Sequence, residues 1–141
     1  MKFIVRGVVE GGRRLGRELG FPTANINIYS ELDAPLGVYA ALVSVVENAE
    51  TGIEKKFGAV TNFGVKPTVS DDPATEIRTL ETHILDLCLP PGEELYGRTI
   101  TVELLRFIRP EKKFTSLDEL RRQIAEDCLR AREILAETAA I

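Results

Sequence analysis

Two short polar side chains, Thr23 and Asn25, follow a proline in residues 19–25, Leu-Gly-Phe-Pro-Thr-Ala-Asn. Pro22 fixes its own φ and favours an extended conformation for the residue before it. On an extended chain, residues two apart point to the same side. A hydroxyl and an amide oxygen held side by side can bind a phosphate or complete part of a Mg²⁺ shell. A turn whose side chains bond local backbone has the same composition, so this segment alone leaves both interpretations open.

A second candidate phosphate site directly precedes this segment. Residues 10–20 contain four glycines and three arginines, among them Gly11 and Arg17, in a chain whose net charge is −4. Glycine lets backbone N–H groups approach an anion closely, and arginine adds a fixed positive charge. No Gly-Lys-Ser/Thr follows, so the segment is not a Walker loop. A solvated hairpin loop is the alternative.

A candidate general base comes from a predicted strand at residues 79–86. Alternation along that strand places Glu81 and His83, the one histidine of the chain, on the same face, opposite Leu80 and Ile84. A strand carboxylate can act as a base when a substrate proton comes within about 3 Å. The alternative is a solvent-facing glutamate beside a histidine bonded to a neighbour.

The elements that must position these groups are mostly strands. β-Branched and aromatic residues predict them, and residues 61–69 break the pattern. The predicted strands cover residues 3–9, 26–29, 38–46, 55–60, 79–86 and 99–108. Strands of this length and spacing favour an antiparallel barrel.

One long helix follows a stiff charged turn at residues 109–114. Ser116 and Glu119 form a capping box, so the helix is expected over residues 117–137. Its apolar stripe, with the spacing of core packing, is Leu117, Leu120, Ile124, Cys128, Ala131 and Leu135. We expect the helix to cover one open edge or end of the barrel.

The bulk properties indicate one soluble domain. The chain has 141 residues, a net charge of −4 and two cysteines, Cys88 and Cys128. The acidic balance gives no general reason to expect nucleic acid or an anionic membrane as a partner. Two cysteines are too few for a disulfide framework, which favours a reducing cytoplasm. The sequence has no apolar run that could span a bilayer and no recognisable signal peptide.

Taken together, the chain resembles the riboflavin kinase (flavokinase) family, including the kinase half of the bifunctional bacterial FAD synthetases. Pro-Thr-Ala-Asn at residues 22–25 and Glu-Thr-His at residues 81–83 are specific in combination. The matching blocks are residues 7–11, 16–25, 61–68, 80–86, 95–97 and 109–114. They cover almost the whole chain, so we expect one riboflavin kinase domain at residues 1–141.

The resemblance implies a mainly β fold, a six-stranded antiparallel Greek-key barrel with one long C-terminal α-helix. It implies transfer of the γ-phosphoryl of ATP to the ribityl 5′-hydroxyl of riboflavin, giving FMN and ADP. Thr23 and Asn25 would hold Mg²⁺ and phosphate oxygens, Gly11 and Arg17 would lie on the ATP phosphate loop, and Glu81 would be the base.

The resemblance also implies a flap over the flavin, to which Arg109, Lys112 and Phe114 would belong. A turn stiffened by proline can close over a substrate and exclude water. The role of His83 stays open. We expect a cytoplasmic monomer, and the family allows a neighbouring FMN adenylyltransferase domain.

Two other functions are alternatives to riboflavin kinase activity. The first is a flavin- or nucleotide-binding barrel that has lost turnover, although every residue needed for catalysis is present. The second is a barrel that binds single-stranded nucleic acid, which requires a basic groove with stacking aromatics. A net charge of −4 with no tryptophan does not favour it.

Overall fold

Six strands and one helix form the part of the chain that the structure, a computed structural model, describes: residues 3–10, 23–28, 33–48, 50–66, 77–86 and 97–139. The strands are β1 (Phe3–Val8), β2 (Ala24–Ile28), β3 (Gly37–Asn48), β4 (Ile53–Lys66), β5 (Ile77–Ile84) and β6 (Thr99–Arg109). The helix is α2 (Leu117–Ala139). Every strand and the helix predicted from the sequence are present, with shifted ends.

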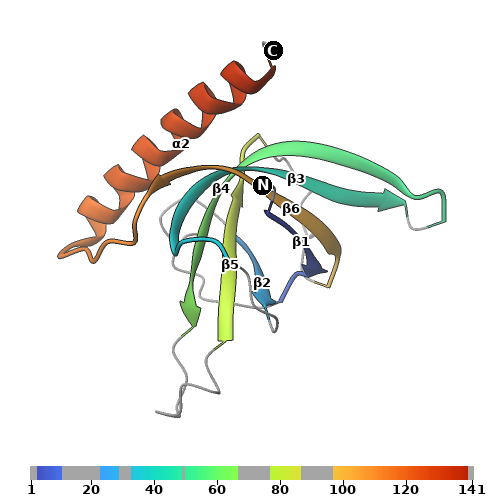
Figure 1. Cartoon of the computed structure of the whole chain (residues 1–141), viewed down its shortest axis with the longest axis horizontal. Helices are drawn as coiled ribbons and strands as arrows, with labels where there is room; N and C mark the ends of the chain where they lie inside the picture. The colour runs from blue at the N-terminus through green and yellow to red at the C-terminus, as the bar shows by residue number, and fades with distance from the viewer. Residues whose placement is uncertain are drawn as a thin grey trace.

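The strands form one antiparallel sheet in the order β1-β6-β3-β4-β5-β2 (Figure 1). β3, β4 and β5 are consecutive neighbours and β6 returns beside β3, which is a Greek-key arrangement. The outermost strands of this order meet at an isolated bridge, where the N–H of Glu10 donates to the carbonyl oxygen of Asn25 at 2.7 Å. The sheet is therefore a nearly closed barrel, as predicted.

The barrel interior is packed with side chains that alternate along the strands. Thr61 and Thr82 face each other there, fully buried, with their hydroxyl oxygens 3.1 Å apart. This pairing satisfies two hydroxyls that would be costly to bury alone. Around them lie the large buried side chains Ile26, Val43, Phe63, Leu80, Ile100 and Val102. Because alternate residues face the interior, their neighbours in the sequence point outward.

The prediction that residues 61–69 break the strand pattern is wrong as far as Lys66. β4 continues through Lys66 and pairs with both β3 and β5. Two ladders of backbone hydrogen bonds and the burial of Thr61 and Phe63 outweigh the low strand preference of Asn62 and Gly64.

The helix packs across the outer surface of β3 and β4, not over an edge or end of the barrel as predicted (Figure 1). The outward side chains Val38, Ala40 and Val60 form a second apolar cluster with Ala131 and Ile134 of α2. An apolar strip in the middle of a sheet face has to be covered, and that requirement places the helix there.

The predicted helix stripe is right at its C-terminal half and wrong at its start. Cys128, Ala131 and Leu135 pack on the barrel, whereas Leu117 is 56% exposed. Leu117 is the first helical residue, and the apolar cluster draws its helix residues from Cys128 onward. The apolar spacing therefore begins nearer the N-terminus of the helix than the part that the barrel covers.

Two register shifts turn the end of β6 toward the helix. Tyr39 pairs with Phe107 but Val38 pairs with Arg109, and Ala41 pairs with Leu104 but Ala40 with Arg106. β6 therefore carries one extra residue at each step, and such bulges redirect the side chains that follow. As a result, both Arg106 and Arg109 reach carboxylates of α2.

Candidate functional site

Three polar side chains from three neighbouring strands form a row on the outside of the barrel. Glu81 of β5 is the register partner of Asn25 in β2 and of Asn62 in β4. Residues directly opposite each other on antiparallel strands point to the same face, with Cβ atoms about 4.5–5.5 Å apart. The fold thus brings together Asn25 and Glu81, which are 56 positions apart in the chain. We call Asn25, Glu81 and Asn62 the polar row.

The polar row leads across the barrel to the flap. Asn62 is opposite Val38 in β3, and Val38 is in turn opposite Arg109, the last residue of β6. The metal-binding candidate, the candidate base and the first flap residue therefore lie along one line of cross-strand partners.

Asn25 carries a polar atom for which the described residues offer no partner. The residue is 7% exposed, and its side-chain Oδ1 is buried without a hydrogen bond to any of them. A buried polar atom left in this state costs about 1–3 kcal/mol, so it calls for an explanation. An amide oxygen is a ligand that hard divalent cations accept. Asn25 therefore fits the predicted metal site.

The other predicted metal ligand, Thr23, is half-buried immediately before β2. No group of three or more His, Cys, Asp or Glu side chains that could hold a metal occurs in the described parts of the chain. A cation beside Asn25 would therefore depend on Asn25, Thr23, substrate oxygens and water, which is the kind of site that Mg²⁺ uses with phosphates.

The candidate base faces as the sequence predicts. Leu80, Thr82 and Ile84 are buried in the interior, while Glu81 and His83 are half-buried on the opposite face. Glu81 belongs to β5, which pairs with β2 on one side and with β4 on the other, so its backbone is held on both sides. A base with a fixed backbone needs little reorganisation to reach a substrate proton.

Sequence reasoning assigned no role to Asn62 or Glu111, although both lie at the site. The carboxylate of Glu111 occupies the space that a Cβ at Gly64 would take, and Nδ2 of Asn62 is 3.6 Å from the same point. Only glycine allows this approach to the β4 backbone. Asn62 could have been found from its place between the inward-facing Thr61 and Phe63. The position of Glu111 has no local signal.

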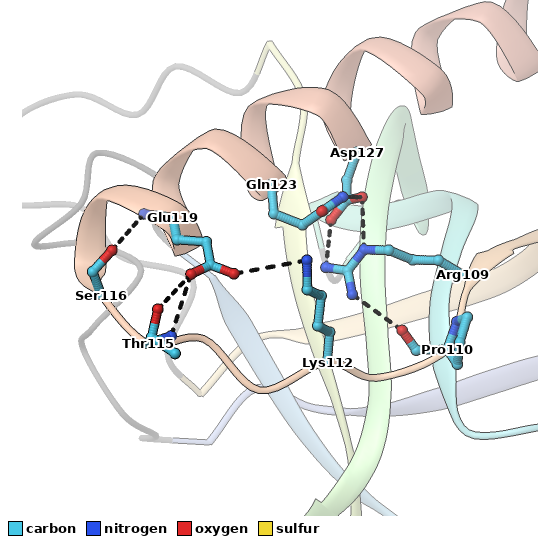
Figure 2. Close-up of polar contacts among 8 residues, drawn as sticks. All are labelled: Arg109, Pro110, Lys112, Thr115, Ser116, Glu119, Gln123 and Asp127. Atoms are coloured by element: carbon cyan, nitrogen blue, oxygen red, sulfur yellow. Dashed lines mark hydrogen bonds and ion pairs between the residues drawn. The ribbon is translucent and has the colours of Figure 1, made fainter.

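The predicted flap begins with an arginine whose guanidinium is bound to the helix (Figure 2). Nε and Nη2 of Arg109 donate to the two carboxylate oxygens of Asp127, at 2.9 and 2.7 Å. Its Nη1 donates to the carbonyl oxygen of Pro110 at 3.1 Å. The half-buried Phe114 ring lies near both cations, 5.9 Å from Cζ of Arg109 and 5.6 Å from Nζ of Lys112.

The start of the helix holds the far end of this loop. The Glu119 N–H donates to Oγ of Ser116 at 3.1 Å, as the capping box predicts. Its carboxylate instead accepts from the hydroxyl of Thr115 at 2.7 Å and pairs with Nζ of Lys112 at 3.7 Å. Hydrogen bonds from Thr115, and to a lesser degree the charge of Lys112, lower the pKa of Glu119 below its usual range. Figure 2 shows these contacts tying residues 110–116 to α2.

Two predicted site residues, Gly11 and Arg17, lie outside the described residues. In the described parts of the chain, no helix is both long enough and apolar enough to cross a membrane.

Comparison with known proteins decides the family. The flavokinase (riboflavin kinase) family model matches residues 1–135. The chain belongs to the riboflavin kinase family. The predicted family and barrel fold are thereby confirmed. Membership does not assign the individual site residues.

One relative within the riboflavin kinase family is the bifunctional riboflavin kinase/FMN adenylyltransferase of Escherichia coli (strain K12). It is 43% identical over 136 residues, which are 96% of this chain and 39% of that protein. The chain thus spans about two fifths of the length of the curated relatives it matches.

Two solved structures share the riboflavin kinase barrel. The riboflavin kinase of Trypanosoma brucei has a TM-score of 0.60 at 26% identity, over 96% of this chain and 80% of that one. A structure described as a macrolide-efflux protein from Streptococcus pneumoniae has a TM-score of 0.72 at 30% identity, over 92% of this chain and 38% of that one. Efflux is attributed to that longer protein alone.

Proposed function

We propose that this domain transfers the γ-phosphoryl group of ATP to the 5′-hydroxyl of riboflavin, with the polar row as its reaction centre. The observation that carries the proposal is the pairing of Asn25, whose Oδ1 is buried without a partner among the described residues, with Glu81. A phosphate-side ligand and a candidate base then lie one strand apart. Phosphoryl transfer requires mainly this kind of positioning, together with neutralisation of charge.

In the proposed reaction, the ribityl hydroxyl oxygen attacks the γ-phosphorus as the bond to the bridging oxygen of ADP breaks. The carboxylate of Glu81 accepts the hydroxyl proton, and ADP leaves with the bridging oxygen. Thr23 and Asn25 would hold phosphate oxygens and a divalent cation. Because both side chains offer oxygen ligands, we propose that this cation is Mg²⁺. Such a cation neutralises charge on the phosphates when it is bound.

The remaining predicted residues keep their proposed roles on the two substrates. Gly11 and Arg17 would contact the ATP phosphates, and Lys112 and Phe114 would lie over the flavin. We propose a cytoplasmic location and a monomer, without a nucleic acid or membrane partner. We also propose a neighbouring FMN adenylyltransferase domain, an activity that the name of the E. coli relative includes.

The first test separates the kinase from a barrel that only binds flavin or nucleotide. We expect the protein, incubated with riboflavin, ATP and Mg²⁺, to form FMN and ADP in a one-to-one ratio, both measured by chromatography. Omission of Mg²⁺ should abolish FMN formation because the phosphate charge is then not neutralised. Folded protein that binds riboflavin and makes no FMN would refute the proposal and support the binding module.

A further inference from the structure

Asp127 of α2 is a buried carboxylate to which the proposed reaction gives no role. The residue is 3% exposed, and it is the one acidic residue that is buried among those the structure describes. Burying a carboxylate is costly unless it is paired and hydrogen-bonded. Asp127 meets this condition through Arg109, which binds both of its oxygens, and through Gln123, whose Nε2 donates to Oδ1 at 3.0 Å.

Arg109 joins Asp127 to the start of the predicted flap. It is the last residue of β6, and residues 110–116 follow it. Two of its nitrogens bind Asp127 and the third binds the carbonyl oxygen of Pro110, so the whole guanidinium is used internally (Figure 2). Bidentate pairing fixes the plane of a guanidinium as well as its position.

Two side chains of the loop depend on where this anchor lies. The ring of Phe114 is 5.9 Å from Cζ of Arg109. Glu111, two residues after Arg109, lies against Gly64 near Nδ2 of Asn62. The anchor therefore sets how the loop approaches the polar row from the β6 side.

A second ion pair between β6 and α2 shows that joining these elements does not require a buried charge. Nη1 of Arg106 lies 2.9 Å from Oε2 of Glu137, and their side chains are 51% and 57% exposed. Buried ion pairs add little stability compared with apolar residues of similar size, so stability alone does not account for Asp127. Its location at the flap suggests that it fixes geometry.

We propose that Asp127 is a positioning residue for the riboflavin site, which acts by holding Arg109 and, through Arg109, the loop of residues 110–116. Arg109 is then the anchor of the flap and Phe114 the side chain it presents. This inference rests on the proposed function, because it takes the flavin as the ligand under the flap.

The test compares Asp127→Asn and Gln123→Ala with the control Glu137→Gln. Riboflavin affinity is measured by quenching of flavin fluorescence with Mg-ADP present, and KM for riboflavin and ATP and kcat are measured where FMN forms. Asp127→Asn should weaken riboflavin binding about fivefold or more, since it loosens a charge-assisted hydrogen-bonded pair. Gln123→Ala should also weaken riboflavin binding, by a smaller factor. In both variants, KM for ATP and kcat should stay within about twofold of the wild-type values. In Glu137→Gln, the riboflavin affinity, both KM values and kcat should all stay within that range.

Two results would overturn the inference. One is folded Asp127→Asn protein with wild-type riboflavin affinity. The other is a parallel loss of riboflavin and ATP affinity, which would indicate a general structural role. If Asp127→Asn does not fold, Gln123→Ala decides, and unchanged riboflavin affinity in that variant overturns the inference. A wild-type protein that binds riboflavin without making FMN refutes the proposed function, while the binding comparison still decides the role of Asp127.

Discussion

At the scale of single residues, the site differs from the rest of the barrel in leaving polar groups in costly environments. Asn25 keeps a buried oxygen without a partner among the described residues, and Asp127 is a buried charge that requires Arg109. Groups in such positions lower stability unless they bind something or hold something in place. We interpret Asn25 as the first kind and Asp127 as the second.

This interpretation predicts opposite effects of Asn25→Ala on stability and on catalysis. The free energy of unfolding in urea should change by less than about 0.5 kcal/mol or rise, because the lost oxygen has no described partner. The Mg²⁺ concentration that gives half-maximal activity should rise about tenfold or more, which is the loss typical of disturbed metal sites.

The matched control is Asn27→Ala, which removes the same side chain two residues along the outer face of β2, opposite Thr79. Its Mg²⁺ dependence should equal that of the wild type. A large loss of stability in Asn25→Ala with normal Mg²⁺ dependence would show that Asn25 is structural.

At the scale of elements, the barrel and α2 have separate tasks. The strands fix the polar row through their pairing. The helix α2 covers the outer apolar cluster, and its first three turns hold the predicted flap at residues 109–116. Gly58 shows how close the helix lies, because a Cβ there would collide with the side chain of Leu135. The two bulges of β6 connect these tasks, since they turn Arg109 toward the helix.

This division predicts that two substitutions on one helix differ sharply. Ile134 is 1% exposed in the outer cluster and Leu129 is 64% exposed on the same helix. Ile134→Ala should lower the free energy of unfolding by about 2–5 kcal/mol, because it leaves a cavity under the helix. Leu129→Ala should stay within about 0.5 kcal/mol of the wild type. Urea denaturation followed by circular dichroism measures both, and equal losses would mean that α2 does not pack as described.

At the scale of the whole molecule, the sequence is sufficient to predict the class of fold but not its contacts. Alternation correctly placed Glu81 and His83 opposite Leu80 and Ile84, because a strand's faces depend only on local order. The capping box correctly located the start of α2, because it too depends only on residues close together in the sequence. The family resemblance supplied the barrel topology.

What the sequence could not supply depends on pairing between distant segments. No local feature indicates that Asn25 and Asn62 both lie opposite Glu81, since register is set by whole strands. The strand beyond Val60 was missed because two neighbouring ladders, not its own residues, keep it extended. Asp127 was missed because its partner Arg109 reaches it only after the bulges in β6.

We propose above that the polar row is the reaction centre, with Glu81 as the group that accepts the proton. The most direct test is single-turnover formation of FMN by Glu81→Gln. The control is Glu103→Gln, which makes the same exchange of carboxylate for amide at a half-buried position elsewhere on the barrel. Glu81→Gln should lose about 100-fold or more in the rate of phosphoryl transfer, the range expected for a lost general base, with riboflavin affinity nearly unchanged. Glu103→Gln should keep the wild-type rate. A Glu81→Gln rate within about tenfold of the wild type would show that Glu81 is not the base, because general acid–base catalysis contributes more than that.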